Sequence, residues 1–355
     1  MGAKANASLR KQFLIAGCLY IGQLSVGFTL GWTAPVLAKL QNEEETPLDH
    51  VISDAQASWI LSFIFLGTII GPYLSAYLYN VIGRKPCLYI GGGIVMSGND
   101  KRDEAMENLT SLGRQDDIDE VVAKANEKPK SNIDQLTEMY TIRSNRRATF
   151  IIIVLNILQQ SSGVVAVGAF VTIIFDMTGS DLESHISTII IGVTQVVSAT
   201  IAPVLIDRTG RKSLLLISTA ACSISLTALG TFFFLHVNDY PIAEDLQWLS
   251  LVSLMIFFIA YFAGFGIIPN TYIGEMFTDT CRGFGGTFTS TIAWVWGFGV
   301  STAFGYMLPA WGPAAVFWIF SGACAFAFFF SALFVPETKG KSLLEIREIL
   351  GKSWI

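Results

Sequence analysis

Two adjacent glutamines stand inside a long stretch of the sequence that has no charged side chain. Gln159 and Gln160 lie near the centre of residues 148–175, where Asp, Glu, Lys and Arg are all absent. A primary amide has two N–H donors and a carbonyl acceptor, so a pair of amides suits a ligand that carries many hydroxyl groups. The alternative is a structural role, in which each amide bonds a neighbouring helix and contributes about 0.6 kcal/mol. The residues alone leave both roles open.

Charged residues gather instead at the borders of such uncharged stretches. The segment "DRTGRK" at 207–212 and a similar one, "VIGRKPCLY" at 81–89, both place Gly-Arg-Lys just after an apolar run. Glycine permits a tight turn, and cations are favourable at the C-terminal end of a preceding helix. Acidic side chains nearby would pair with these cations. The simplest alternative is a positively charged anchor that keeps the loop on one side of a membrane.

The composition indicates a membrane protein. Of the 355 residues, 52% are hydrophobic and 14% are charged, and the mean hydropathy is +0.53. A soluble protein carries about 25% charged residues. Eight uncharged windows reach the roughly 17–25 residues that a spanning helix needs, so the sequence predicts an all-α membrane protein. These windows are 13–38, 57–82, 148–175, 186–206, 213–235, 247–273, 285–308 and 312–335.

The distribution of Lys and Arg predicts the orientation of these spans. With the N-terminus inside, the four external loops near 41–56, 176–185, 236–246 and 309–311 contain no Lys or Arg. Of the 23 basic residues, 22 then lie on the cytoplasmic side, and Lys39 is the exception. This is a strong positive-inside signal. We therefore expect a multi-pass membrane protein whose two termini are both cytoplasmic.

One apolar run is too short to cross. Residues 87–97 reach roughly 16 Å as a helix, about half of a hydrocarbon core that is ~30 Å thick, and a charged tract follows at once. We expect this half-span to lie in the interface or to re-enter the bundle.

The chain then divides into an N-terminal bundle at 1–97, a cytoplasmic insert of amphipathic helices at 98–147, a six-span bundle at 148–335 and a cytoplasmic tail at 336–355. A disordered linker is the alternative for the insert.

Four segments together resemble one known family. "QQSSG" at 159–163, "DRTGRK" at 207–212, "EMFTDTCRG" at 275–283 and "PETKGKSLLEI" at 336–346 are similar to motifs of the sugar porter family of the major facilitator superfamily, most of all to insect trehalose and hexose carriers. The resemblance implies a major facilitator helical bundle. It also implies that most of spans three to six is absent, which leaves about 2.5 spans in the N-terminal half and a complete six-span C-terminal half.

The resemblance also assigns roles to residues. The substrate would be bound by Gln159, Gln160, Gln195 and Trp294. A cytoplasmic latch between the two bundles would be formed by Asp207, Arg208, Arg211, Lys212, Glu275, Arg282, Glu337 and Arg84. Alternatives remain for the binding residues, namely interhelical hydrogen bonds for the glutamines and ordinary packing for the tryptophan. Departures from the family pattern at Val165, Asn270 and Ala293 leave the identity of the sugar open.

The implied activity is facilitated, uncoupled transport of a sugar such as trehalose or a hexose by alternating access. The uncharged windows offer no carboxylate for a proton relay, and Thr29 stands about where proton-coupled sugar porters carry an acid. The rival hypothesis is a non-transporting isoform that regulates or senses, or a non-functional product. We expect no enzyme activity, no cofactor or metal and no nucleic-acid partner. Membrane lipid surrounds the spans, we expect residence in the plasma membrane, and the oligomeric state is not predicted.

Overall fold

The computed structural model describes residues 33–42, 46–48, 50–82, 132–178, 184–278 and 281–351. Every regular element within these ranges is a helix, as the composition predicts. Six helical segments are long and apolar enough to cross a membrane. The predicted first span lies outside the described residues except for its end, where residues 33–40 are helical. The predicted half-span at 87–97 also lies outside them.

Three of the predicted spans are single helices. α2 covers Asp54–Ile82, α10 covers Ser184–Thr209 and α11 covers Arg211–Val237. Each helix extends up to three residues beyond its uncharged window, because the helix continues through the polar residues that flank the hydrocarbon core. Only Gly210 separates α10 from α11, and its φ of 94° is a conformation that glycine adopts without strain.

The predicted span at 148–175 is broken into three helices. α7 covers Arg143–Ser161, α8 covers Val164–Ala169 and α9 covers Val171–Asp176. The first break lies at Gly163, whose φ is +72°. A Cβ at this position would lie 2.2 Å from the ring of Phe320, so both the backbone conformation and the close approach of that ring require glycine here.

The predicted span at 247–273 is broken too. α13 covers Gln247–Ala260 and continues as one π-helical turn, η2, at Tyr261–Phe265; α14 then covers Ile268–Met276. Pro269 lies in the first turn of α14, where its missing N–H is tolerated and its fixed φ suits the helix. The break therefore separates a longer apolar half from a short half that ends in the polar segment around Glu275.

The last two predicted spans form one continuous element. α15 covers Arg282–Phe334, and Gly312 (φ 78°, ψ 163°) is the one residue inside it with a non-helical backbone. The prediction of a loop at 309–311 is therefore wrong, because these residues are helical. The chain turns at Gly312 alone. Pro313 follows directly and starts the second span with a φ that already suits a helix.

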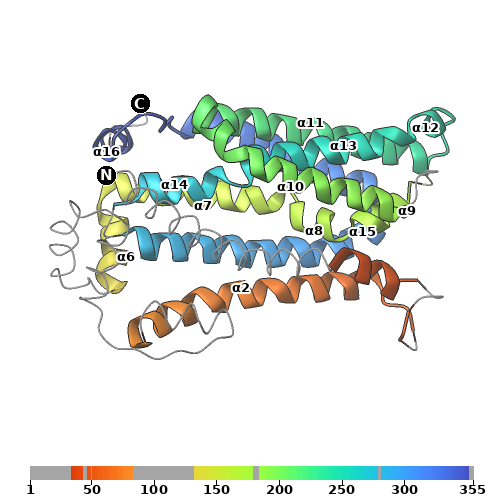
Figure 1. The fold of residues 1–355 in the computed structure, drawn as a ribbon, viewed down its shortest axis with the longest axis horizontal. Helices are drawn as coiled ribbons and strands as arrows, with labels where there is room; N and C mark the ends of the chain where they lie inside the picture. The colour runs from red at the N-terminus through yellow and green to blue at the C-terminus, as the bar shows by residue number, and fades with distance from the viewer. Residues whose placement is uncertain are drawn as a thin grey trace, which may run out of the picture. The chain divides into compact units, whose positions relative to one another are not determined.

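These helices pack as one compact unit made of residues 31–69 and 132–355. The described part of the other unit, 1–30 and 70–131, is the second half of α2. Figure 1 shows α11, α13 and α10 side by side, with α15 and α7 running alongside them. Small residues permit close contact: a Cβ on Gly230 would lie 2.6 Å from the Trp318 ring. The core is rich in fully buried phenylalanine.

The first half of α2 belongs to this unit and packs against the first half of α15. A Cβ on Gly305 would lie 2.1 Å from Ser58 Oγ, so the two helices nearly touch there. One turn further along, Thr302 Oγ1 donates to Ser62 Oγ at 2.8 Å. Small and hydroxyl residues are typical of helix contacts inside membranes because they allow a close approach.

Short helices cover the two ends of the unit (Figure 1). α6 (Asn132–Thr141) and α16 (Leu343–Gly351) lie at one end, and α12 (Ile242–Asp245) lies at the other. α16 is docked through the buried side chains of Ile346 and Leu350. The Leu350 carbonyl accepts a 2.8 Å bond from the Arg147 guanidinium at the start of α7. α6 is one amphipathic helix of the predicted insert, and residues 98–131 lie outside the described residues.

Candidate functional site

Gln159 donates hydrogen bonds to backbone carbonyls at the break in the span at 247–273. Pro269 has no N–H to give to the carbonyl of Phe265, four residues before it, and Asn270 N–H bonds Ile267 O at 3.1 Å instead of Gly266 O. The Gln159 amide nitrogen donates to Phe265 O at 2.8 Å and to Gly266 O at 2.9 Å. Both of its donors are therefore engaged by the backbone of the break.

Gln160 lies against α15, on a different side of α7. A Cβ on Gly297 would come within 3.1 Å of Gln160 Oε1 and 2.7 Å of a ring carbon of Phe65. The same phenylalanine, from α2, has its ring centroid 5.7 Å from that of Trp294. Two predicted sugar contacts, Gln160 and Trp294, thus flank one aromatic ring. The part-exposed Trp294 presents a flat apolar surface next to a buried amide.

The next residue makes a third, separate contact. Ser161 Oγ accepts a 2.8 Å bond from the indole N–H of Trp296 on α15. We refer to Gln159, Gln160 and Ser161, with the groups they contact, as the midspan junction. Three consecutive residues here connect the end of α7 to the break between η2 and α14 and to α15, directly before the break at Gly163.

Two further polar residues lie within the described spans. The predicted sugar contact Gln195 is half-buried at the middle of α10. Sequence reasoning missed Asn156, which lies one turn before Gln160 on α7. Its side chain is 2% exposed, and its Nδ2 has no hydrogen-bond partner among the described residues. The sequence did offer a signal for Asn156: it lies four residues before Gln160, so it shares a helix face with a candidate sugar-binding residue.

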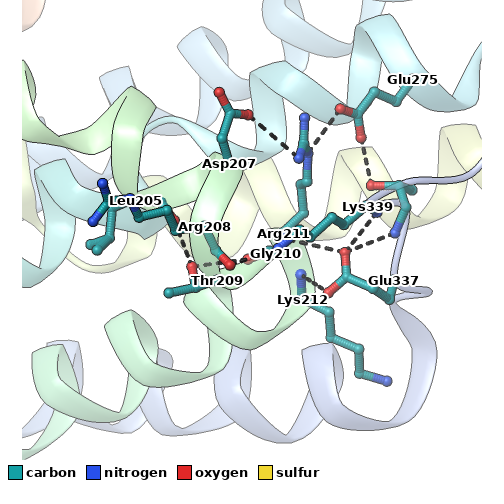
Figure 2. Close-up of polar contacts among 11 residues, drawn as sticks. Leu205, Asp207, Arg208, Thr209, Gly210, Arg211, Lys212, Glu275, Glu337 and Lys339 are labelled. Carbon is teal, nitrogen blue, oxygen red and sulfur yellow. Dashed lines mark hydrogen bonds and ion pairs between the residues drawn. The ribbon is translucent and has the colours of Figure 1, made fainter.

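The carboxylate of Glu337 accepts hydrogen bonds from the backbone at the start of α11. Glu337 Oε1 accepts the N–H of Arg211 at 3.0 Å and Oε2 accepts the N–H of Lys212 at 3.0 Å (Figure 2). Oε1 also accepts the N–H groups of Thr338 and Lys339 at 2.9 Å each. The first N–H groups of a helix have no partner in the helix, and its dipole favours an anion there.

These contacts set the ionisation of Glu337. Partial burial acts to raise its pKa, but the four backbone N–H groups together outweigh burial and hold the pKa below the ordinary value of 4.5. The carboxylate approaches so closely that a Cβ on Gly210 would lie 2.9 Å from Oε2. Glycine at the turn is therefore needed for this anion site as well as for its positive φ.

Ion pairs connect this helix start to α14. Arg211 Nε donates to Glu275 Oε1 at 3.0 Å, and its guanidinium lies 3.7 Å from Asp207. Thr338 Oγ1 donates to the other oxygen of Glu275. We call Asp207, Arg211, Glu275, Glu337 and Thr338 the charged end cluster. Figure 2 shows Arg211 at its centre, between Asp207 and Glu275, with Glu337 below it.

The predicted latch residues are brought together in part. Side chains of four of them meet in the charged end cluster. Arg208 takes part through its carbonyl, which accepts a 2.6 Å bond from Lys339 Nζ, and the Lys212 ammonium bonds Ala332 O at 2.9 Å. Arg282 begins α15, and Arg84 lies outside the described residues. All these contacts join segments within 207–339, so they fasten one bundle; Thr338 and Lys339 were missed although "PETKG" contains them.

A family comparison decides the class of protein. The family model described as "Sugar (and other) transporter" matches residues 96–350, which is more than half of the chain. The chain belongs to this sugar transporter family. The predicted resemblance is thereby confirmed, and the family comprises transporters rather than enzymes. With its apolar helices, the chain is a multi-pass membrane protein.

Members of the sugar transporter family that resemble this chain include insect proteins. A "Facilitated trehalose transporter Tret1" of Polypedilum vanderplanki is 38% identical over 211 residues, which is 59% of this chain and 42% of that protein. The protein of the same name in Culex quinquefasciatus is 32% identical over 294 residues, 81% of this chain and 55% of that protein. The chain thus spans about half the length of these relatives.

Solved structures agree on the fold. The xylose transporter XylE from E. coli in its inward-open conformation superposes with a TM-score of 0.65 at 17% identity, over 95% of this chain and 99% of that chain. The proton:xylose symporter XylE of the major facilitator superfamily, bound to 6-bromo-6-deoxy-D-glucose, gives 0.51 at 19% identity, over 84% of this chain and 68% of that chain. The predicted fold, a helical bundle like that of these major facilitator superfamily structures, is therefore confirmed.

Proposed function

We propose that this member of the sugar transporter family moves trehalose or a hexose down its gradient by alternating access. One observation carries the proposal beyond family membership: a buried amide, Gln160, lies beside the aromatic pair of Phe65 and Trp294. Amides bond sugar hydroxyls, and a flat ring suits the C–H face of a pyranose. The broken spans next to this group match the discontinuous helices that transporters place at their binding sites.

Gln160, Trp294 and Gln195 are the residues we propose for direct contact with the sugar. Gln160 Oε1 and the Phe65 ring lie within 3.1 and 2.7 Å of the place where a Cβ on Gly297 would stand, so a sugar bound beside them would meet a hydrogen-bond acceptor and an apolar ring together. Gln159 belongs to the same predicted set, but its amide nitrogen is already engaged by two carbonyls.

We propose uncoupled transport because acids are confined to helix ends. In the described spans, Asp and Glu occur near the termini of helices, at Asp54, Asp176, Asp207 and Glu275. A proton-driven carrier needs a titratable group within the membrane. We also propose that both termini are cytoplasmic and that the plasma membrane is the site of residence. The charged end cluster then faces the cytoplasm.

Reconstitution of the purified chain in lipid vesicles tests this function. We expect saturable entry of labelled trehalose or glucose that is inhibited by the unlabelled sugar and is unchanged by a proton gradient. Gln160→Ala should lower the flux about tenfold, because a buried sugar hydrogen bond is lost. Gln247→Ala, at the far end of α13, is the matched control and should leave the flux unchanged.

Other results would contradict the proposal in separate ways. Sugar binding without flux would favour the rival, a non-transporting protein that senses or regulates. A flux that follows the proton gradient would show that the uncoupled mechanism is wrong. Absence of both binding and flux would refute sugar transport by this chain.

A further inference from the structure

Trp296 lies near the middle of the first span of α15, about as far from Arg282 as from Gly312. Its side chain is 47% exposed. Tryptophan is enriched at the two surfaces of a membrane, because the ring is apolar and the indole N–H finds a polar partner there. At mid-span the indole N–H needs an acceptor from the protein itself, since burying a polar group without a hydrogen bond is costly.

The hydroxyl of Ser161, the last residue of α7, is that acceptor. Trp296 Nε1 donates to Ser161 Oγ at 2.8 Å, and Ser161 Oγ in turn donates to the carbonyl of Ile157 at 2.8 Å. The hydroxyl group therefore accepts one bond and donates another, as its chemistry allows. We call the bond between Trp296 and Ser161 the indole tether. It joins the end of α7 to the first span of α15.

The indole tether lies next to two of the proposed sugar contacts. Ser161 directly follows Gln160 on α7, and Trp296 lies two residues after Trp294 on α15. Trp296 also precedes Gly297, where a Cβ would lie 3.1 Å from Gln160 Oε1. A hydrogen bond fixes both a distance and a direction, whereas apolar contacts are not directional. The tether therefore fixes how Gln160 lies relative to Trp294.

The end of α7 needs such a fixed contact because the helix stops there. Gly163, with its φ of +72°, interrupts the span two residues after Ser161. The second span of α15 also contacts this break, since a Cβ on Gly163 would lie 2.2 Å from the Phe320 ring. That ring stacks on Phe304 of the first span, with 6.0 Å between the centroids. Both spans of α15 thus contact the broken end of α7, and the tether adds a directional bond to these apolar contacts.

We propose that Trp296 is a positioning residue: its indole N–H, bonded to Ser161, sets the spacing between Gln160 and Trp294 and so the affinity of the site for sugar. Trp296 acts through these two residues and not by touching the sugar. The inference rests on the proposed function, which it deepens by adding a residue that determines the geometry of the site.

Removing either end of the bond provides the test. Trp296→Phe keeps an aromatic ring without the N–H, and Ser161→Ala removes the acceptor. We compare these two variants, their combination and Ser161→Thr, which keeps the hydroxyl, in the full chain. Trp311→Phe is the matched control, because Trp311 is a 60% exposed tryptophan on the same helix, beside Gly312. The readouts are the Kd for trehalose and glucose in detergent, the KM and maximal flux in vesicles, and the indole ¹⁵N–¹H resonances of the tryptophans.

Trp296→Phe and Ser161→Ala should each weaken sugar binding about fivefold and raise the KM equally, with the maximal flux within about twofold. Their combination should also weaken binding about fivefold, and not the roughly 25-fold expected of independent effects, because either change alone removes the whole bond. Ser161→Thr and Trp311→Phe should bind sugar like the unmodified chain. The indole resonance that is absent from Trp296→Phe should shift in Ser161→Ala and stay in place in Trp311→Phe.

Three results would overturn the inference. Multiplied losses of affinity in the combined variant would show that Trp296 acts on the sugar independently of Ser161. An unchanged Kd in both single variants would show that the tether does not position the site. An indole resonance of Trp296 that ignores Ser161→Ala would show that the bond does not form. If the unmodified chain binds no sugar, the proposed function fails and takes the positioning role with it, whereas normal binding with any of these three results refutes the positioning role alone.

Discussion

In both the charged end cluster and the midspan junction, a side chain bonds backbone groups that have no partner within a helix, but the two side chains are chemically opposite. At the start of α11 the backbone has unpaired N–H donors, and the carboxylate of Glu337 accepts two of them, from Arg211 and Lys212. At the break before α14 the backbone has unpaired carbonyl acceptors, and the neutral amide of Gln159 donates to two of them. The lesson is that location selects the partner: an ion where water is near, a neutral amide within the membrane.

Gly163→Ala should have the largest effect and tests the midspan junction. The new Cβ would occupy a positive φ and would lie 2.2 Å from the Phe320 ring, so we expect a loss of about 3 kcal/mol in the free energy of unfolding. Denaturant titration of the purified chain in detergent measures it. Gly192→Ala, on α10 with open space around it, is the control and should not destabilise. Equal stability of the two variants would show that the break imposes no special geometry.

Glu337→Gln should have the second largest effect and tests the charged end cluster. Loss of charge-assisted bonds to the start of α11 should cost about 2 kcal/mol of unfolding free energy at pH 7. The folded state holds the pKa of Glu337 below 4.5, so its stabilisation is complete above that pH and is lost as the pH falls through the lowered value. The stability difference between the two proteins should therefore be constant from pH 7 to about 5 and shrink in more acidic solution.

A control distinguishes this site from carboxylates in general. Glu345 bonds Ser342 at the start of α16, and these hydrogen bonds also lower its pKa, but its side chain is solvent-exposed. Glu345→Gln should change stability much less than Glu337→Gln. A larger effect at Glu345 would contradict the importance that we assign to the partly buried start of α11.

Arg211→Lys should have a smaller effect than the two substitutions above. Lysine keeps the charge but cannot direct an Nε–H at Glu275 while reaching toward Asp207, so we expect a loss of about 0.5–1 kcal/mol. Because ions screen such pairs, 0.5 M salt should reduce the difference between the two proteins, as measured by thermal unfolding. Asp207→Asn should have little effect, since 77% of that side chain is exposed.

The stability cost of Gln159→Met should not respond to salt. A response would weaken the contrast between the charged end cluster and the midspan junction.

Within the described residues the uncharged windows coincide with long apolar helices, because length and apolar composition decide whether a helix can cross a membrane. They did not predict the breaks, since a window counts 148–175 as one helix even though Gly163 interrupts it. The charged end cluster was predicted in part because opposite charges beside span borders have few other partners. The bonds of Gln159 escaped prediction for the opposite reason: its partners are backbone carbonyls, which every residue carries, and sequence does not tell which of them a fold leaves unpaired.

Gly312 has a mechanical consequence. It is the one non-helical residue within α15, so no slack separates the last two spans. The first carries Trp294 and Gly297 beside Gln160, and the second runs almost directly into Glu337. The two spans therefore form one hairpin, and in the transport cycle that we propose a tilt of the first span at Trp294 would reach Glu337 with Gly312 as the single hinge between them.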